Sequence, residues 1–334
     1  MNIAVILPIG KSDYLANTVL DGLIDFQSED EKLSFIVTKK YPNPFNLLKY
    51  ERDEKDFIDY AKTADIVILA WGKNSTNFSL AEKISAWQKT AFVDGSELGK
   101  NNRSDESIRK SVSEERYNGI GAIDSNMLTK CKLYFRREKP YIKGIIPLPF
   151  GIERRYRKFF KKGEKRDIDF SCIFGQDEYP PLRKQAKEFL EKFCRKNDFS
   201  CHTKKTKGFN FDDNTKLAGR DDFYKILSRT KVGISIGGGG FDTARFWEIL
   251  GSGAMLLTEN IAIYEENSDK LDYKRIAQFS NLDEFKLKIK ELGNYIRDVY
   301  DNDQDKLDKE YDKVIENHST KNRVKNIIEH FNEK

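Results

Sequence analysis

The sequence has no hydrophobic run near the roughly 20 residues that cross a membrane. Its opening, MNIAVILPIG, lacks a basic leader and reads as a first strand instead of a signal peptide. The four cysteines show no paired, metal-type spacing, so we expect reduced thiols and a cytoplasmic protein. The net charge is only +5 and no RNA- or DNA-binding motif is present, so we expect no nucleic-acid partner.

Catalytic and cofactor motifs are also scarce. No strand is followed by Gly-x-Gly-x-x-Gly, which argues against a nicotinamide dehydrogenase. Gly10-Lys11-Ser12 mimics the end of a phosphate loop, but Val5 stands where that loop needs its first glycine. Asp-x-Asp pairs occur at 167–169 and 301–303, before a strand and in a polar helical tail. We interpret both as surface carboxylates and expect no essential metal.

What is present is an alternation of strand and helix patterns through both halves of the chain. This alternation predicts βαβ units with parallel sheets, and 334 residues are enough for two such domains. The segment 100–124 is polar and predicted to be irregular. The predicted strands are 2–7, 33–38, 65–71, 90–93, 132–137, 145–152, 169–174, 200–203, 232–236, 254–257 and 277–280, and the main predicted helices are 14–26, 52–63, 182–193, 221–228 and 282–296, followed by two within 304–331.

The most informative stretch, 231–260, reads as strand, glycine turn, helix, tight turn and strand. A glycine loop before a helix offers backbone amides and the positive end of the helix dipole to an anion. Arg245 and Glu248 share one face of that helix, where a cation suits a phosphate and a carboxylate suits sugar hydroxyls. The alternative is a flexible turn beside a solvent-facing ion pair of little energetic value. The four glycines of the turn are Gly237, Gly238, Gly239 and Gly240.

Other candidate residues follow predicted strands, where doubly wound sheets bind ligands. Gly10 ends the first strand, and the alternative for it is an ordinary strand-to-helix turn. Asp94 and Glu97 follow the strand 90–93, as candidates for a general base or as parts of a capped turn. Arg136 and Arg137 end a strand, where they would meet a phosphate or acidic acceptor, or only solvent.

A basic segment, 152–166, separates the two halves and holds eight Lys or Arg and two Glu with interleaved aromatic residues. We interpret this segment as a solvated linker. The alternative is peripheral contact with an anionic membrane surface, which would place the protein at the inner face of the membrane.

Four motifs of the C-terminal half carry a resemblance to a known family. They are a strand followed by Gly175 and a basic helix, then DDFYKILSRTKVGISI, DTARFWEILGSGAMLLT and HSTKNRV. Together they resemble GT-B glycosyltransferases, nearest to the bacterial group related to spore maturation proteins. The resemblance covers about residues 167–334, and FVDGSE and KLYFRRE … IIPLPFGI are similar to N-terminal segments of some of these enzymes.

The resemblance implies an α/β fold with two doubly wound, Rossmann-like domains that face each other across a cleft. Residues 1–151 would form the acceptor-side domain, and 152–166 would form the linker. Residues 167–316 would form the nucleotide-sugar domain, and 317–334 a helix that crosses back to the first domain.

The resemblance also implies roles for particular residues. Glu248 matches a glutamate that binds ribose hydroxyls, and Arg245 matches an arginine near the phosphates. Gly175 and the loop 237–240 match turns that face the donor. Retaining members often carry a second acidic residue at the position of Gly240, so inversion and retention both stay open.

These features predict transfer of a sugar from a nucleotide-sugar donor to a hydroxyl of a glycan or lipid-linked acceptor, in surface-glycan assembly and without a cofactor. For an inverting reaction, the first candidate base is Asp94 and the second is Glu97. The alternative is a non-catalytic nucleotide-sugar-binding or partner-binding protein of the same fold. A sugar-nucleotide epimerase ranks lower, because glycines replace the Asp-Ser-Gly-Gly turn typical of that class.

Overall fold

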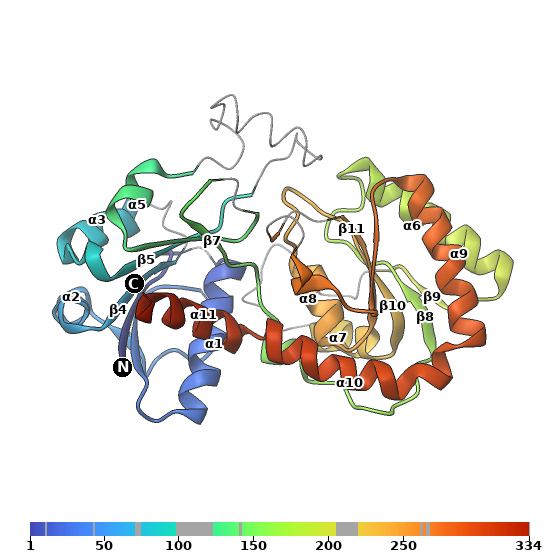
Figure 1. Ribbon diagram of the computed structural model, residues 1–334, viewed down its shortest axis with the longest axis horizontal. Helices are drawn as coiled ribbons and strands as arrows, with labels where there is room; N and C mark the ends of the chain where they lie inside the picture. Colours follow the sequence, from blue (N-terminus) through green and yellow to red (C-terminus); the bar gives the residue numbers. More distant parts are fainter. Residues whose placement is uncertain are drawn as a thin grey trace.

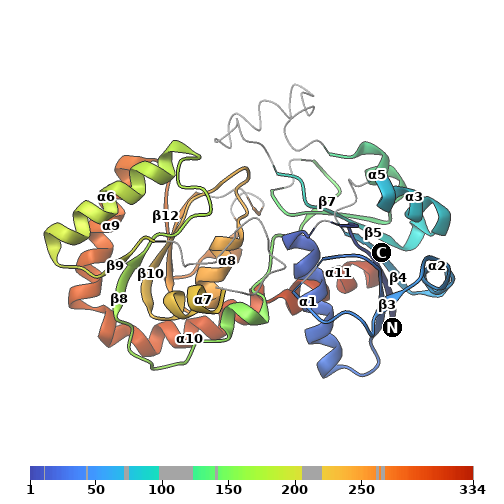
Figure 2. The ribbon, with the colours of Figure 1, turned by 180° about the vertical axis from the view of Figure 1, so that it is seen from behind.

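Two parallel sheets lie side by side, each covered by helices, in the computed structural model (Figures 1 and 2). The first sheet has seven strands in the order β3-β2-β1-β4-β5-β6-β7, and the second has five in the order β12-β11-β10-β8-β9. This architecture confirms the predicted α/β fold with two Rossmann-like units. The structure describes residues 1–10, 12–42, 44–70, 75–97, 123–139, 142–204, 220–260, 263–264 and 268–333, so most of the segment 100–124 and Lys11 lie outside it.

The N-terminal half is built on strands that are buried on both faces. Strand β1 is apolar and pairs in parallel with β2 and β4, as expected for a central strand between two helical layers. Helix α1 begins after Asp13, whose carboxylate accepts hydrogen bonds from two backbone amides of the first turn. The elements are β1 (Asn2–Ile6), α1 (Tyr14–Glu29), β2 (Ser34–Thr38), β3 (Glu51–Arg52), α2 (Glu54–Thr63), β4 (Ile66–Ala70), α3 (Ser75–Ile84), β5 (Thr90–Asp94), α5 (Ser125–Lys130), β6 (Leu133–Arg136) and β7 (Ile145–Pro147).

The C-terminal half repeats the scheme around β10, which lies between β8 and β11. Gly233 of β10 lets Ile249 of helix α8 pack directly on the strand, because a Cβ there would lie within 3.0 Å of that side chain. The elements are β8 (Ile168–Ser171), α6 (Pro181–Asn197), β9 (Cys201–His202), α7 (Arg220–Ser228), β10 (Thr230–Ser235), α8 (Ala244–Gly251), β11 (Met255–Glu259), β12 (Ile276–Phe279), α9 (Leu282–Asp298), α10 (Tyr300–His318) and α11 (Thr320–Asn332).

The last two helices join the halves. Helix α10 runs along the C-terminal half, and α11 packs against α1 in the N-terminal half (Figure 1). The backbone of Ile152 bonds on both sides of the break between them, accepting from Thr320 at 3.3 Å and donating to His318 at 2.8 Å. Apolar residues of both halves therefore belong to one continuous core.

The basic segment 152–166 is packed into this junction, so the expectation of a solvated linker is wrong for much of it. Tyr156 and Arg166 are buried, and Arg166 donates to backbone carbonyls of the C-terminal half. Arg154 donates to Asp21 of α1 at 2.9 Å. Cations that already have protein partners are poor candidates for a membrane contact.

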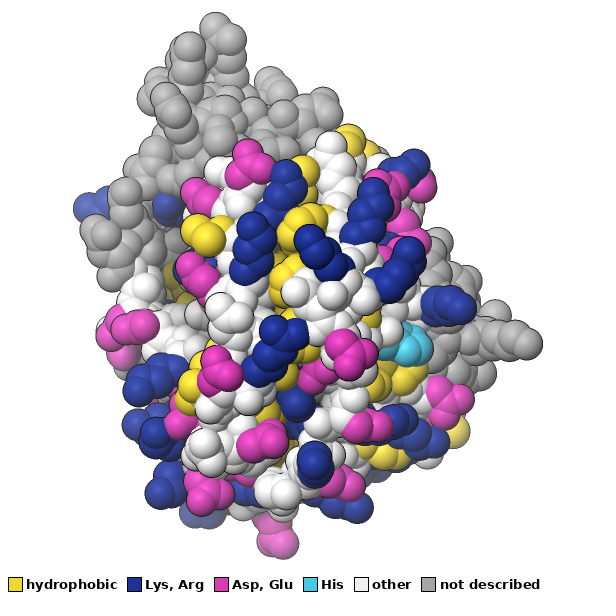
Figure 3. Space-filling view, turned by 90° about the vertical axis from the view of Figure 1, so that its right-hand side faces the viewer, with side chains coloured by type: hydrophobic (Ala, Val, Ile, Leu, Met, Phe, Trp, Pro, Cys, Tyr) yellow, Lys and Arg dark blue, Asp and Glu magenta, His cyan; other side chains and the backbone are white. Residues whose placement is uncertain are grey.

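The described residues form no membrane-spanning helix, and the outer face of the C-terminal half carries charges of both signs (Figure 3). No helix among the described residues is long and apolar enough to cross a bilayer. On the outer face of the C-terminal half, basic and acidic side chains are interspersed (Figure 3). Several of them form exposed ion pairs, such as Lys286 with Asp283 and Lys288 with Glu291.

Candidate functional site

The glycine turn after β10 already binds carboxylates of this chain. The Gly237 amide donates to Glu259 at 3.0 Å, and the amides of Phe241 and Asp242 donate to Glu138 at 2.6 and 3.1 Å. Of these three amides, only that of Gly237 belongs to the predicted loop 237–240, and binding of a ligand anion by that loop stays a prediction. In this arrangement, all three amides are engaged inside the protein.

Carboxylates of the N-terminal half come close to two of the glycines. A Cβ at Gly239 would lie within 3.0 Å of Glu97, and a Cβ at Gly240 within 3.0 Å of Glu138. Any side chain at these two positions would push the carboxylates away. The turn is therefore a close contact between the two halves as well as a loop.

The turn after β5 separates the two predicted general bases. Asp94 is fully buried and accepts hydrogen bonds from Tyr134 at 2.6 Å and from the Ser96 amide at 2.9 Å. Arg136, also buried, lies 3.5 Å from the same carboxylate. Glu97 differs, because its side chain is 44% exposed and lies against the glycine turn. Of the two, only Glu97 is accessible to a substrate hydroxyl.

Arg245 and Glu248 form a buried ion pair in α8. Their side chains are 2.7 Å apart and only 10% and 3% exposed, which excludes the alternative of a solvent-facing pair. Arg245 also donates to the Ile173 carbonyl at 2.9 Å and stacks on Phe223. Additional bonds of this kind compensate the cost of burying charge.

Further groups from both halves surround Glu248. Tyr224 donates to it at 3.4 Å, and Arg220 lies 3.8 Å away. Tyr14, at the start of α1, bonds with Arg220 across the junction. Burial, reinforced by the negative charge of Glu248, raises the pKa of Tyr14, so its hydroxyl stays protonated at neutral pH.

Gly10 and Gly175 lie in the turns after β1 and β8, four residues beyond the end of each strand. Gly10 has φ of +69°, a value that favours glycine, and its amide donates to the Lys40 carbonyl at 3.0 Å. Gly175 follows β8 in the turn that leads to α6. Both turns are at the carboxyl ends of their sheets, as are the glycine turn and the turn after β5.

Several residues at this place were not among the candidates predicted from the sequence. Arg183 of α6 donates to the Ile236 carbonyl at 2.9 Å, beside the glycine turn. Glu138 and Glu259 bind the turn's amides, and Arg220 faces Glu248. The sequence signal for Arg220 is its position directly before the predicted helix 221–228.

No group suited to a metal ion occurs in the part of the chain that the structure describes, where at least three His, Cys, Asp or Glu side chains would have to converge. The absence of an essential metal stays a prediction.

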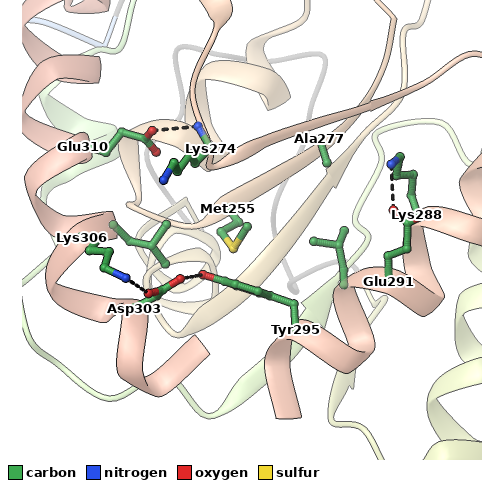
Figure 4. A pocket seen from close by; sticks show the side chains of 11 residues that line it. Met255, Lys274, Ala277, Lys288, Glu291, Tyr295, Asp303, Lys306 and Glu310 are labelled. Carbon is green, nitrogen blue, oxygen red and sulfur yellow. Dashed lines mark hydrogen bonds and ion pairs between the residues drawn. The ribbon is translucent and has the colours of Figure 1, made fainter. Parts of the chain in front are cut away.

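Two cavities lie away from the glycine turn. One, of about 360 Å³, is at the junction and is lined by residues that include His318, Arg323 and Tyr264. The other, of about 300 Å³, lies between β12, α9 and α10 (Figure 4). Its apolar floor includes Met255, and its rim carries ion pairs such as Lys306 with Asp303.

Comparisons with known proteins show similarity of structure only. No family model and no curated protein sequence matches the chain. An alpha-glucosyltransferase in complex with UDP aligns with a TM-score of 0.61 at 10% identity, covering 99% of this chain and 100% of that one. An alpha-glucosyltransferase with UDP and a 13-mer DNA containing an A:G mismatch gives 0.59 at 11% identity, covering 99% and 100%.

A glycosyltransferase from Rickettsia africae ESF-5 gives a TM-score of 0.54 at 14% identity, covering 99% of this chain and 98% of that one. At such identities the likeness establishes the fold, which is the predicted GT-B arrangement of two Rossmann-like domains. The finer resemblance to the group related to spore maturation proteins stays a prediction.

Proposed function

We propose that this protein is a glycosyltransferase that uses a nucleotide-sugar donor. The observation that carries the proposal is the buried Arg245–Glu248 pair, which lies in the helix that follows β10 and is linked through Arg220 to Tyr14 of the N-terminal half. Ligands of open parallel sheets bind at the carboxyl ends of the strands. The GT-B fold and the UDP complexes of its structural neighbours support a nucleotide-sugar as the ligand.

In this proposal the donor lies between the two halves. Glu248 is 3% exposed, so it accepts hydrogen bonds from the ribose hydroxyls only after the donor displaces Tyr224 from it. Arg245 and Arg220 attract the diphosphate and stabilise the charge that develops as it leaves. Gly175 and the glycine turn 237–240 line the same space. The amides of 237, 241 and 242 are engaged by carboxylates, so the arginines are the stronger candidates for the phosphate contact.

For an inverting reaction we propose Glu97 as the general base on the acceptor hydroxyl. Its carboxylate is accessible and lies against the glycine turn of the donor side. Asp94 is the weaker candidate because it is buried and bonded to Tyr134 and Ser96, and we assign it the role of fixing this turn. This reverses the order expected from the sequence.

The acceptor and the pathway are further parts of this proposal. A glycan or lipid-linked acceptor in surface-glycan assembly, handled in the cytoplasm, is the expectation carried from the sequence. DNA is a second acceptor to test, because one structural neighbour was solved with DNA. The alternative function, a binding protein of the same fold without catalysis, is favoured by the carboxylates that occupy the glycine turn.

The test is a panel of nucleotide-sugars offered with glycan, lipid-linked and DNA acceptors, and with water alone. Release of the nucleoside diphosphate identifies the enzyme and its donor. Tight nucleotide binding without turnover on any acceptor identifies the binding protein. Absence of both would refute the proposal.

The nucleotide site is tested separately by Glu248→Gln. We expect at least ten-fold weaker UDP binding in calorimetry, because an amide is a poorer acceptor for two hydroxyls than a carboxylate. Glu316→Gln, at an exposed position of the distant helix α10, is the matched control. Equal affinity of wild type and Glu248→Gln would remove Glu248 from the site.

A further inference from the structure

Three consecutive charged residues follow β6 and are all buried. Arg137, Glu138 and Lys139 are 7%, 0% and 8% exposed. Buried charges require partners. Folding of the N-terminal half alone does not explain why three consecutive charged residues are buried at the end of β6. Both Arg137 and Glu138 have described partners in the C-terminal half.

Arg137 and Glu138 both form hydrogen bonds with the backbone of one residue of the C-terminal half, Asp242. Glu138 accepts from its amide at 3.1 Å and from the preceding Phe241 amide at 2.6 Å. Arg137 donates to the Asp242 carbonyl. The neighbouring residues Phe241 and Asp242 therefore give three backbone bonds to two charged side chains of the other half.

The side chain of Asp242 completes the contact. One carboxylate oxygen accepts from the Trp247 indole at 2.7 Å, and the other accepts from the Phe150 amide at 2.8 Å. Trp247 belongs to α8 and Phe150 to the segment after β7, so this carboxylate also bridges the two halves. Asp242 is fully buried.

We propose that Arg137 and Glu138 form an interdomain clamp that holds the glycine turn against the N-terminal half. The clamp holds the two halves together at this point and sets the distance between the glycine turn and Glu97. Arg137 serves both sides, since it also lies 3.4 Å from the Gly95 carbonyl and 3.5 Å from Glu97. The clamp does not depend on the proposed function. Only an effect of the clamp on sugar transfer would rest on that function.

The direct test is hydrogen exchange of the peptide that contains Phe241 and Asp242, with small-angle scattering as the measure of closure. In Glu138→Ala we expect exchange at these amides to be at least ten-fold faster and the radius of gyration to increase. Glu138→Gln retains an accepting oxygen, so it should restore part of the protection, which general destabilisation would not do.

Asp21→Asn is the control, because Asp21 also binds groups across the junction, Arg154 and Thr320, but not the glycine turn. Its exchange at 241–242 should equal that of wild type. Equal exchange in wild type and both Glu138 variants would overturn the clamp. Faster exchange with an unchanged radius would also overturn it, since Glu138 would then only cap the turn.

Adding UDP separates the two proposals. One outcome is that UDP leaves hydrogen exchange and the radius of gyration unchanged in wild type and in all variants, while the Glu138 variants still show faster exchange and a larger radius. That result would support the clamp and refute the nucleotide site. If UDP binds and the Glu138 variants behave as wild type, the nucleotide site stands and the clamp falls.

Discussion

At the scale of single residues, the turn after β5 shows how burial divides chemically similar groups. Asp94 and Glu97 are three positions apart, yet one is enclosed by Tyr134 and Arg136 and the other reaches the glycine turn. A general base has to reach the proton that it removes. Sequence spacing cannot make this distinction, because it depends on which residues fold over the strand end.

We predict that Glu97→Gln lowers the rate of transfer at least 100-fold in an inverting reaction, in line with the usual contribution of a general base. Its UDP affinity should stay within about two-fold of wild type. The measurement is single-turnover transfer with the donor found by the panel. Full activity of this variant would indicate retention or a different base.

Asp94→Asn should act through stability instead. Removing the carboxylate leaves Arg136 buried without its counter-charge, which typically costs about 3–5 kcal/mol. Denaturant unfolding should show this loss, whereas Glu97→Gln should unfold as wild type does. A variant of normal stability but without activity would restore Asp94 as the base.

At the scale of elements, Gly22 of α1 allows helix α11 to pack closely against α1. A Cβ at Gly22 would lie within 3.0 Å of the Thr320 carbonyl and of Val324. The backbone cannot move away as a flexible side chain would, so this position tolerates no larger residue.

Gly22→Ala is therefore predicted to destabilise the protein by about 1–3 kcal/mol, although alanine favours a helix. Ser28→Ala, on the exposed end of the same helix, is the control and should be nearly neutral. The two are compared by urea unfolding. A stabilised Gly22→Ala would show that α11 does not pack on α1 in solution.

The break between α10 and α11 contains a buried histidine. His318 donates to the Lys270 carbonyl through Nε2 at 2.8 Å, and Arg323 donates to its Nδ1 at 3.1 Å. Tyr264 and Tyr273 also contact the ring. Burial and the charge of Arg323 lower the pKa of His318 well below its usual value, so the folded protein holds it neutral.

This depressed pKa predicts a stability that falls in acid. The unfolded chain protonates this histidine near pH 6.5 and the folded chain does not, so stability is complete above that pH and is lost below it. The loss is about 1.4 kcal/mol for each pH unit below the unfolded value. Unfolding from pH 7.5 to 5 should show a shallower slope in His318→Gln than in wild type, and an equal slope would contradict the assignment.

At the scale of the whole molecule, the N-terminal half depends on the last helix of the chain. Val324, Ile327 and Phe331 of α11 are buried in the core that includes Val19 and Leu23 of α1. Burying such side chains contributes about 1.5–3 kcal/mol each. The sum is comparable to the total stability of a typical domain.

A chain that ends at His318 should therefore lose the folded N-terminal half while α/β structure persists in the other. Limited proteolysis with mass spectrometry should show cleavage confined to residues before about 150. Lys325→Ala with Glu329→Ala, which removes an exposed pair from the other face of α11, should leave the pattern unchanged. Uniform resistance of the truncated chain would contradict this dependence.

The fold could be predicted because its signals are local. Apolar runs such as Ile66–Ala70 bounded by polar helices indicate buried parallel strands wherever they occur. The cap of α8 is local in the same way, because the Thr243 side chain accepts a hydrogen bond from the Phe246 amide in the first turn. The prediction of a solvated linker was wrong because charge alone does not reveal the partners of its arginines. Arg154 binds Asp21, and Arg166 binds two backbone carbonyls.

The sequence by itself determined the alternation of elements, the two parallel sheets and the pairing of Arg245 with Glu248, because these depend on spacings of a few residues. Only the tertiary structure decided what the glycine turn faces. Glu138 and Asp242 are 104 positions apart in the chain. The packing of the helices on both sheets, and of α11 on α1, brings the two residues together. Long-range contacts of this kind depend on the whole core, and no local pattern encodes them.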